Sequence, residues 1–526
     1  MAFELRELLA PASFPHEVNC LQTRETALSW IVLTGPFAYK IKKSLHLDYV
    51  NTTTLASRRH LCAEELRLNR RLAPDLYVDV VAIVREAGGL RIASSGNAVE
   101  YAVRMRQFDP AQELACLLER HEVSPGEIAA FAEDIADFHA GAAIETNSAD
   151  YPGTERLYSA VRSNLGSLLA RQSGGPGPNG LGRLVDWTHD CLSTELRRIR
   201  AREYLGFIRE CHGDLHAHNV VRWKGRLTAF DCIEFAPGLR WIDTMNDVAF
   251  MVMDLAGHDR WDLAMCFLNR YLERSGDYAG VRLLAFYAAY RALVRAMVDS
   301  IFAQQHPEQI GEYLQRAQRR IATAAGFMDR PRPALILMHG PSGSGKSWVS
   351  ERLCGPLHAV RVRSDVERKR FAADAGAGNG DGGVDRGLYA PQVSEHTYAR
   401  LADCAEDCLG GGFNTIIDAA FLRHEDRQRF TDLAARREIP CLILSCAADR
   451  SVLAERIEAR RRAASDPSDA NLAVLQKQLR SAEALDALEL ENSIAVDTND
   501  AQTLPHVLAA VRDRCGAHLA GATDIH

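Results

Sequence analysis

Apolar and polar residues are patterned differently in successive parts of the chain. Residues 29–33 and 37–43 are two short apolar runs on either side of Thr34-Gly35-Pro36, a pattern that predicts two strands joined by a turn. Strand-like runs of this kind dominate residues 1–108, whereas residues 109–325 show mainly helical spacing. We therefore predict a mixed lobe of strands with one helix, followed by a mainly helical lobe.

The last part of the chain alternates buried strands with helical stretches, after a break at Gly326–Pro333 that predicts a linker. Such alternation is typical of a parallel sheet, because each parallel crossover needs a long connection, usually a helix. We therefore predict an α/β domain with a parallel sheet over residues 334–526. The strands that define it are A-L-I-L-M-H at 334–339, A-V-R-V-R at 359–363, N-T-I-I-D at 414–418 and C-L-I-L-S-C at 441–446.

The helix predicted in the first lobe, from about residue 52 to about residue 72, carries a carboxylate in its apolar stripe. This carboxylate is Glu65, whose spacing from the leucines puts it on the buried face, while Glu64 faces outward. A buried carboxylate needs a partner. Lys40 and Lys42 share one face of the preceding strand, so either can pair with Glu65, although both could also be solvated edge lysines.

Composition narrows the class of protein. A chain of 526 residues is too long for one core, which indicates three units, or two of which one is bilobal. The net charge of -7 gives no bulk attraction to nucleic acid or anionic membranes, although a local basic groove is compatible with it. The first residues are charged where a signal peptide would be apolar, and no apolar run approaches a membrane span. The thirteen scattered cysteines are interpreted as reduced thiols, and together these features predict a cytoplasmic protein.

Three polar residues in the segment from Cys211 to Phe235 have a spacing that phosphoryl transfer can use. Asp214 is followed five residues later by Asn219, and Asp231 comes twelve residues after that. Two short apolar runs lie between Asn219 and Asp231, which predicts a hairpin that brings all three side chains to one cleft. Asp214 can then orient and deprotonate an attacking hydroxyl. Asn219 and Asp231 supply the oxygen ligands that Mg²⁺ prefers.

Two other interpretations of this segment remain open. Asp214 and Asn219 are residue types that also occur in turns for local hydrogen-bonding reasons. The three histidines His212, His216 and His218 could hold a metal, since imidazole is a good zinc ligand, but no fourth ligand is evident.

A second nucleotide site is indicated by G-P-S-G-S-G-K-S, which follows a predicted strand and precedes a helical stretch. This is the context of a P-loop, in which backbone N–H groups and the helix N-terminus cradle phosphates. Lys346 would reach the outer phosphates and Ser347 would bind Mg²⁺, supported through water by Asp418 at the end of a later strand. The loop comprises Gly340, Pro341, Ser342, Gly343, Ser344, Gly345, Lys346 and Ser347.

The H-G-D at 212–214, with Asn219 and Asp231 after it, resembles the catalytic segment of aminoglycoside phosphotransferase-like kinases over residues 20–325. This resemblance implies a bilobal protein-kinase-like fold. It also implies that Lys40, in F-A-Y-K, holds ATP phosphates and pairs with Glu65, with Lys42 as a competitor. No G-x-G-x-x-G precedes Lys40, which favours this branch over protein kinases, because phosphotransferases of the aminoglycoside type also lack the full glycine loop. The acidic pocket that binds polycationic antibiotics has no recognisable counterpart.

Members of this family have a later aspartate that acts as a structural anchor, and the resemblance implies that Asp247 has this role here.

Residues 333 to about 515 resemble AAA_33-type predicted kinases, whose relatives include polynucleotide kinases and zeta-toxin-like proteins. The resemblance implies that Asp365 faces the acceptor hydroxyl and that Arg368 holds substrate, although a helix N-cap at Ser364 or Asp365 is an alternative. Arg456 and Arg460 resemble the lid arginines of small P-loop kinases, and a solvated basic helix face is the alternative for each. The tandem of two domains resembles bacterial bifunctional aminoglycoside phosphotransferase/ATP-binding proteins.

We therefore predict an α+β bilobal protein-kinase-like domain followed by an α/β P-loop domain. The function expected is a two-module kinase that uses ATP and Mg²⁺ to phosphorylate hydroxyl acceptors. The acceptor is expected to be a small molecule for the first module, and a small molecule or a nucleic-acid 5′-hydroxyl for the second. One alternative is that one module binds ATP only to regulate the other, and another is that the C-terminal module is a plain ATPase. The sequence identifies neither acceptor.

Overall fold

The structure is a computed structural model, and it describes residues 3–47, 50–86, 89–94, 96–145, 153–172, 180–374, 391–463, 471–500 and 502–515. The contacts within the chain divide it into two compact units. The first unit comprises Met1–Ser163 and Ser193–Asp254, and the second comprises Asn164–Leu192 and Leu255–His526. The limits predicted from the sequence at residues 108, 325 and 334 stay a prediction about domains.

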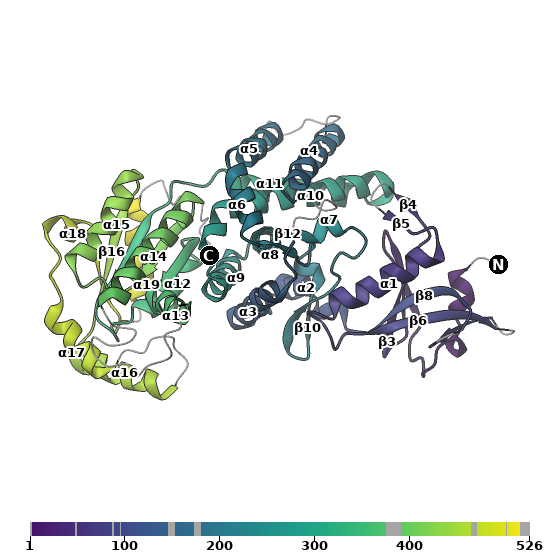
Figure 1. The fold of residues 1–526 in the computed structure, drawn as a ribbon, viewed down its shortest axis with the longest axis horizontal. Coiled ribbons are helices and arrows are strands. Elements are labelled where there is room, and N and C mark those ends of the chain that lie inside the picture. Colours follow the sequence, from purple (N-terminus) through teal and green to yellow (C-terminus); the bar gives the residue numbers. More distant parts are fainter. Residues whose placement is uncertain are drawn as a thin grey trace. The chain divides into compact units, whose positions relative to one another are not determined.

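The first unit begins with an antiparallel sheet of six strands in the order β1-β2-β3-β8-β6-β7. Tyr39 and Ile41 of β3 pack in the core on one face of this sheet, while Ala38 packs on the other face with residues of α1. Figure 1 shows α1 lying along β8 and β6. The bounds are β1 Gln22–Glu25, β2 Ser29–Leu33, β3 Phe37–Lys42, β6 Tyr77–Glu86, β7 Gly89–Ala93, β8 Ala98–Arg106, α1 Leu55–Asn69 and the short pair β4 His46–Leu47 and β5 Val50–Asn51.

The rest of the first unit is mainly helical and carries the predicted hairpin. This hairpin forms as β10 and β11, which pair antiparallel with Val221 opposite Thr228. A second short antiparallel pair joins β9 to β12. The elements are α2 Leu114–Glu119, α3 Pro125–Gly141, α6 Leu196–Tyr204, β9 Ile208–Glu210, β10 Val220–Trp223, β11 Arg226–Ala229, α7 Pro237–Arg240, β12 Trp241–Asp243 and α8 Thr244–Gly257.

The second unit contains a parallel sheet of five strands in the order β14-β15-β13-β16-β17. The bounds of its strands are β13 Leu335–His339, β14 Ala359–Arg363, β15 Asn414–Asp418, β16 Cys441–Ala447 and β17 Ser493–Asp497. Because the strands are parallel, their carboxyl ends meet at one edge of the sheet. The loop after the central strand β13 therefore lies beside the ends of β15 and β16, with the end of β14 one strand further along the sheet.

Helices complete the second unit. Within the sheet domain they are α12 Lys346–Cys354, α13 Ser364–Asp374, α14 Pro391–Gly410, α15 His424–Arg436, α16 Arg450–Ala463, α17 Leu472–Ser481, α18 Ala487–Glu491 and α19 Thr503–Cys515. Three helices precede the sheet in the sequence, α9 Trp261–Ser275, α10 Val281–Gln305 and α11 Ile310–Met328. The chain passes from one unit to the other at three points, one each inside α4 Gly153–Gln172, α5 Gly180–Thr194 and α8. Within the described residues, no helix combines the length and the apolar character that crossing a membrane requires.

Helix α11 extends three residues into the segment that the sequence predicts to be a linker, since it ends at Met328 rather than before Gly326. Phe327 explains the extension, because its side chain is buried and its ring packs on that of Trp261. The glycine is tolerated in the last turn, where packing contributes more than helix propensity.

Helix α9 covers the outer edge of the sheet. Strand β14 is an edge strand, whose backbone groups lack a neighbouring strand on one side. The buried side chain of Asn269 replaces that neighbour: its Oδ1 accepts the N–H of Arg361 at 2.6 Å, and its Nδ2 donates to the carbonyl of Ala359 at 3.0 Å. The sheet edge is therefore closed by one amide side chain.

We predict that Asn269→Ala lowers the free energy of unfolding by about 2–3 kcal/mol, because two buried backbone groups of β14 lose their partners. Urea denaturation followed by circular dichroism measures the effect. The exposed Asn492→Ala serves as the control and should change stability by less than about 1 kcal/mol. Equal effects of the two substitutions would contradict the role of Asn269 at the sheet edge.

Candidate functional site

The predicted catalytic segment of the first unit is anchored by a buried aspartate. Asp247 of α8 accepts the backbone N–H groups of His212 and Gly213, each at 3.0 Å, and lies 3.2 Å from Nε2 of His139. Gly213 has φ 88°, and a Cβ there would lie 2.7 Å from the carbonyl oxygen of Leu239. Only glycine fits this turn, and the two N–H bonds fix the backbone just before Asp214.

Asp214 and Asn219 lie together in the loop that follows. The Nδ2 of Asn219 donates to the backbone oxygen of Asp214 at 3.0 Å and to its Oδ2 at 2.9 Å. His216 Nε2 lies 3.2 Å from the same Oδ2. A second buried aspartate, Asp254, accepts the N–H of Ala217 at 2.7 Å and holds the loop from the other side. The carboxylate of Asp214 is thus oriented while a third of its side chain remains exposed.

Strand β11 brings Asp231 to this loop. The N–H of Phe230 donates to the carbonyl of Asn219 at 2.9 Å, so the residue before Asp231 is bonded to the loop. Asp231 has φ 64°, and its N–H donates to the hydroxyl of Tyr77 at 3.2 Å. The amide of Asn219 and the carboxylate of Asp231 offer hard oxygen donors of the kind that Mg²⁺ binds. This donor set fits the metal that the sequence predicts.

Both candidate lysines contact Glu65, which is completely buried. Lys40 Nζ lies 2.8 Å from Glu65 Oε1 and 2.5 Å from Asp231 Oδ1. Lys42 Nζ lies 2.5 Å from Glu65 Oε2 and pairs with Glu234 as well. Lys40 therefore stands next to the proposed metal ligand, whereas Lys42 is held by a second carboxylate that sequence reasoning missed. Glu64, in contrast, forms its ion pair with Arg67 on the outer side of the helix.

The electrostatics of this cluster keep Glu65 ionised. Burial by itself raises the pKa of Glu65, but the ammonium groups of Lys40 and Lys42 outweigh it and lower this pKa to about 2. Burial likewise lowers the pKa of Lys42, and the carboxylates of Glu234 and Glu65 overcome that effect and raise it to about 12. Glu65 and Lys42 are therefore charged throughout the physiological range.

The alternative of a histidine metal site is not supported by the positions of the side chains. His212 Nε2 lies 2.9 Å from the carbonyl of Phe230, and its Nδ1 accepts the N–H of Asp214 at 3.3 Å. His216 Nδ1 accepts the N–H of His218 at 3.3 Å. Both rings are thus used to shape the loop, and in the described part of the chain no cluster of potential metal ligands contains His212, His216 or His218.

In the second unit, the loop between β13 and α12 has the close approaches that a P-loop needs. Gly340 has φ 134°, and a Cβ there would lie 2.3 Å from the carbonyl oxygen of Cys446. Gly343 has φ 84°, with the carbonyl oxygen of Leu453 at 2.7 Å from the position of a Cβ. Lys346 curls back over the loop, and its Nζ donates to the carbonyl of Pro341 at 2.8 Å.

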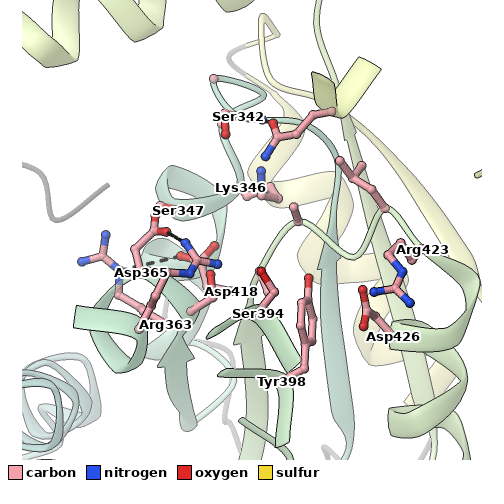
Figure 2. A pocket seen from close by; sticks show the side chains of 18 of the residues that line it. Ser342, Lys346, Ser347, Arg363, Asp365, Ser394, Tyr398, Asp418, Arg423 and Asp426 are labelled. Carbon is pink, nitrogen blue, oxygen red and sulfur yellow. Dashed lines mark hydrogen bonds and ion pairs between the residues drawn. The ribbon is translucent and has the colours of Figure 1, made fainter. Parts of the chain in front are cut away.

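Most of the predicted residues of this site line one cavity of about 450 Å³. Figure 2 shows Asp365 and Asp418 on one side of this cavity, Arg423 and Asp426 on the other, and Tyr398 between them. Asp365 and Arg368 are one turn apart on α13 and form an ion pair of 2.9 Å. The predicted residues in the lining are Ser342, Gly343, Gly345, Lys346, Ser347, Asp365, Arg368, Asp418 and Arg456; Gly340, Pro341 and Ser344 belong to the loop but not to the lining.

Ser347 and Asp418, the predicted metal ligands, lie at one end of the cavity (Figure 2). Asp418 ends β15, and its Oδ2 lies 3.1 Å from the hydroxyl of Ser350 on α12. A serine hydroxyl and a carboxylate are again hard oxygen donors, which fits Mg²⁺.

Arg456 lines the cavity from α16 and is tied to its neighbours. It donates to Thr498 Oγ1 at 2.8 Å, to Asn499 Oδ1 at 3.1 Å and to the carbonyl of Gly343 at 3.4 Å. Arg456 thus connects α16 to the P-loop. Arg460, the other predicted lid arginine, belongs to the same helix, but its side chain falls outside the described residues.

Sequence reasoning missed an acidic residue behind the P-loop. Glu273 of α9 forms an ion pair of 2.7 Å with Arg361, whose other nitrogen donates to the carbonyl of Ser347 at 3.4 Å. Arg363 of the same strand lies 3.7 Å from Glu273 and 3.9 Å from Asp418. The two arginines in the otherwise apolar A-V-R-V-R indicated that an acidic partner was needed. The sequence did not identify this partner, because Glu273 lies 88 positions before Arg361.

Comparison with known protein families identifies one match, to the AAA domain family AAA_33 over residues 335–485. Among curated proteins, the chain is 30% identical over 446 residues to the uncharacterized protein Rv2004c of Mycobacterium tuberculosis H37Rv. This alignment covers 84% of the chain and 86% of the relative. The uncharacterized protein Mb2027c of Mycobacterium bovis matches with the same identity and coverage.

Solved structures resemble separate parts of the chain. A choline/ethanolamine kinase family protein from Mesorhizobium loti covers 60% of this chain and 89% of its own, with 14% identity and a TM-score of 0.37. A gluconokinase from Sinorhizobium meliloti covers 35% of this chain and 95% of its own, with 21% identity and a TM-score of 0.26.

The charge cluster predicts a specific pH dependence of stability. Because the pKa of Glu65 is about 2 in the folded chain and near 4.5 otherwise, its contribution is fully present above pH about 5 and is lost as the pH falls toward 2. We expect the wild type to have a higher free energy of unfolding than Glu65→Gln at pH 5. This difference should decrease by about 3 kcal/mol as the pH falls from 5 to 2. Urea titrations at several pH values measure it.

The exposed Glu119→Gln is the matched control for this titration and should follow the wild type at every pH. A difference between wild type and Glu65→Gln that stays constant from pH 5 to pH 2 would contradict the charged cluster.

The glycine geometry gives a second prediction. Gly340→Ala should reduce affinity for a fluorescent ATP analogue at least tenfold, since the added Cβ cannot fit beside Cys446 without moving the loop. The titration uses chains that also carry Lys40→Ala, so that binding at the P-loop dominates. Gly326→Ala, where a Cβ meets nothing within 4 Å, is the control and should bind as the parent does. Unchanged affinity in a folded Gly340→Ala variant would show that the loop tolerates a side chain.

Proposed function

We propose that this chain, which belongs to the same family as the uncharacterized protein Rv2004c of Mycobacterium tuberculosis, is a two-module ATP-dependent phosphotransferase. Each module transfers the γ-phosphate of ATP to a hydroxyl acceptor. The first module uses the cluster around Asp214 in the first unit, and the second uses the P-loop cavity of the second unit. The acceptor of the first module is a small molecule, and that of the second is a small molecule or a nucleic-acid 5′-hydroxyl.

In the first module, Lys40 binds ATP phosphates and is held in place by Glu65, at 2.8 Å. Asn219 and Asp231 would hold Mg²⁺, which neutralises phosphate charge when it is bound. Asp214 accepts the proton of the attacking hydroxyl, in an orientation set by Asn219 at 2.9 Å. The chain contributes mainly by positioning and by electrostatic stabilisation, since phosphoryl transfer asks for little covalent help.

In the second module, the backbone of the loop from Gly340 to Ser347 binds the phosphates at the start of α12. Lys346 and Arg456 contribute positive charge around the transferring group, while Ser347 and Asp418 would hold Mg²⁺. Asp365 accepts the proton of the acceptor hydroxyl. Arg368 positions the carboxylate of Asp365 through an ion pair of 2.9 Å.

The observation that supports a kinase over a plain ATPase is the extent of the P-loop cavity. It continues past Lys346 and Ser347 to Asp365, Tyr398 and Asp426, which leaves room for an acceptor beyond the γ-phosphate. An ATPase needs space there only for water.

The test is phosphate transfer from γ-labelled ATP into a metabolite extract by the wild type and by Asp214→Asn and Asp365→Asn variants. Each variant should lose one labelled product at least 100-fold and leave the other within twofold, because the two sites use separate carboxylates. Products are separated chromatographically. The exposed Asp403→Asn serves as the control and should keep both products.

Three other outcomes would contradict the proposal in different ways. Loss of all transfer from one substitution, with no effect of the other, would make the silent module a regulatory ATP-binding switch. Release of phosphate without any labelled product would make the C-terminal module an ATPase. Full activity of both Asp variants would remove the assigned roles.

A further inference from the structure

The part of the P-loop cavity beyond the phosphate loop is walled by three helices, each of which contributes two polar side chains to it. In every helix the two side chains are about one turn apart, so they lie on the same face. The pairs are Asp365 and Arg368 on α13, Ser394 and Tyr398 on α14, and Arg423 with Asp426 at the start of α15.

Asp426 is the unusual member of this set. Its side chain is 6% exposed, yet it lines the cavity, and Figure 2 shows its carboxylate on the side of Tyr398. Within the ranges that the structure describes, Asp426 makes no hydrogen bond and no ion pair with another residue. Burial raises the pKa of its carboxyl group, and Arg423 offsets this only in part. The oxygens of this carboxylate face the cavity (Figure 2) and accept no hydrogen bond from a described residue, so they are available to a ligand that donates hydrogen bonds.

The neighbouring helix offers hydroxyl groups. The hydroxyl oxygen of Tyr398 accepts the N–H of Phe421 at 3.3 Å, and burial raises the pKa of this phenol, so that it keeps its proton. Tyr398 and Ser394 can therefore donate to an oxygen of the ligand and accept from it. This wall therefore presents a carboxylate, which accepts hydrogen bonds, and two hydroxyl groups, which donate and accept them. Such a set matches a ligand whose groups both donate and accept, as hydroxyls do.

The charge of the cavity limits which donor can bind. Six of its lining side chains are cationic and three are carboxylates. Arg423 is the basic group beside Asp426, and Arg368 is paired with Asp365. Each of these two carboxylates thus has a basic neighbour, so the acceptor end of the cavity has no excess negative charge that would attract an ammonium group, whereas a hydroxyl can donate to Asp426.

We propose that Asp426, with Tyr398 and Ser394, binds the hydroxyls of a polyhydroxylated acceptor that is neutral or anionic, and that a terminal hydroxyl of this acceptor reaches Asp365. This inference rests on the proposed function of the P-loop module. In the transfer, the terminal oxygen forms a bond to the γ-phosphorus of ATP, and the bond from that phosphorus to the bridging oxygen breaks. The electron pair leaves on ADP, and the hydroxyl proton passes to Asp365.

Sorbitol, gluconate and glucamine provide a matched series, since they share four inner hydroxyls and differ in the charge of one end. The experiment uses the full chain carrying Asp214→Asn, which silences the first module, and γ-labelled ATP. Sorbitol or gluconate should be phosphorylated with a kcat/KM at least tenfold above that of glucamine. A preference for glucamine would overturn the proposal.

Variants locate the binding group. Asp426→Asn keeps the size of the side chain but loses its charge, and it should raise the KM of the acceptor at least tenfold while the KM of ATP changes less than twofold. Tyr398→Phe should also raise the KM of the acceptor. Asp432→Asn, an exposed aspartate on the same helix, is the matched control and should leave both constants unchanged. An acceptor KM that is unaffected in Asp426→Asn would overturn the proposal.

Binding separates this inference from the proposed function. If none of the three compounds is phosphorylated, saturation-transfer NMR is run on the chain loaded with Mg²⁺ and a non-hydrolysable ATP analogue. Binding of sorbitol or gluconate that disappears in Asp426→Asn supports the polyol site and counts against transfer by this module. If none of the three compounds binds, the polyol site is overturned.

Discussion

The need to compensate buried charge is the constraint on which both sites depend. Glu65 is completely buried and is held between Lys40 and Lys42. Glu273 is buried behind the P-loop and is held by Arg361 and, at longer range, by Arg363. Removing one partner of such a group leaves an uncompensated charge in a low-dielectric interior, which costs several kcal/mol. Each charge cluster therefore fixes the distance between the helix and the strand that carry its residues. The same helices and strands position the side chains of the candidate site in each unit.

Buried carboxylates also position the loops through hydrogen bonds from the backbone. Asp247 and Asp254 hold the catalytic segment of the first unit by accepting backbone N–H groups at 2.7–3.0 Å. Hydrogen bonds to an ionised acceptor are stronger than those between neutral groups, so a few of them define the backbone on both sides of Asp214. Asp426 differs from these carboxylates, because it lines a cavity and accepts no hydrogen bond from a residue in the described part of the chain.

The two units meet the same chemical requirement by different means. In the first, Lys40 and the proposed metal ligands come from a sheet and a hairpin that are far apart in the sequence, so the proposed phosphate site depends on long-range contacts such as Lys40 with Asp231. In the second, the proposed phosphate site consists of consecutive backbone N–H groups of one loop, whose glycines accept close contacts with β16 and α16. The first arrangement relies on charge, and the second on backbone geometry.

The sequence by itself determined the features that depend on local spacing. It predicted the P-loop and its glycines, the β10–β11 hairpin, the parallel strands of the second unit and the burial of Glu65, because periodicity and motif context carry that information. It could not choose between Lys40 and Lys42, which share one face of β3, since the choice depends on Asp231, 191 positions away. The ion pairs of Glu273 and the position of Asp426 in the cavity wall were likewise invisible. Only the tertiary structure decided them, because a contact between distant elements depends on how the helices pack against the sheet.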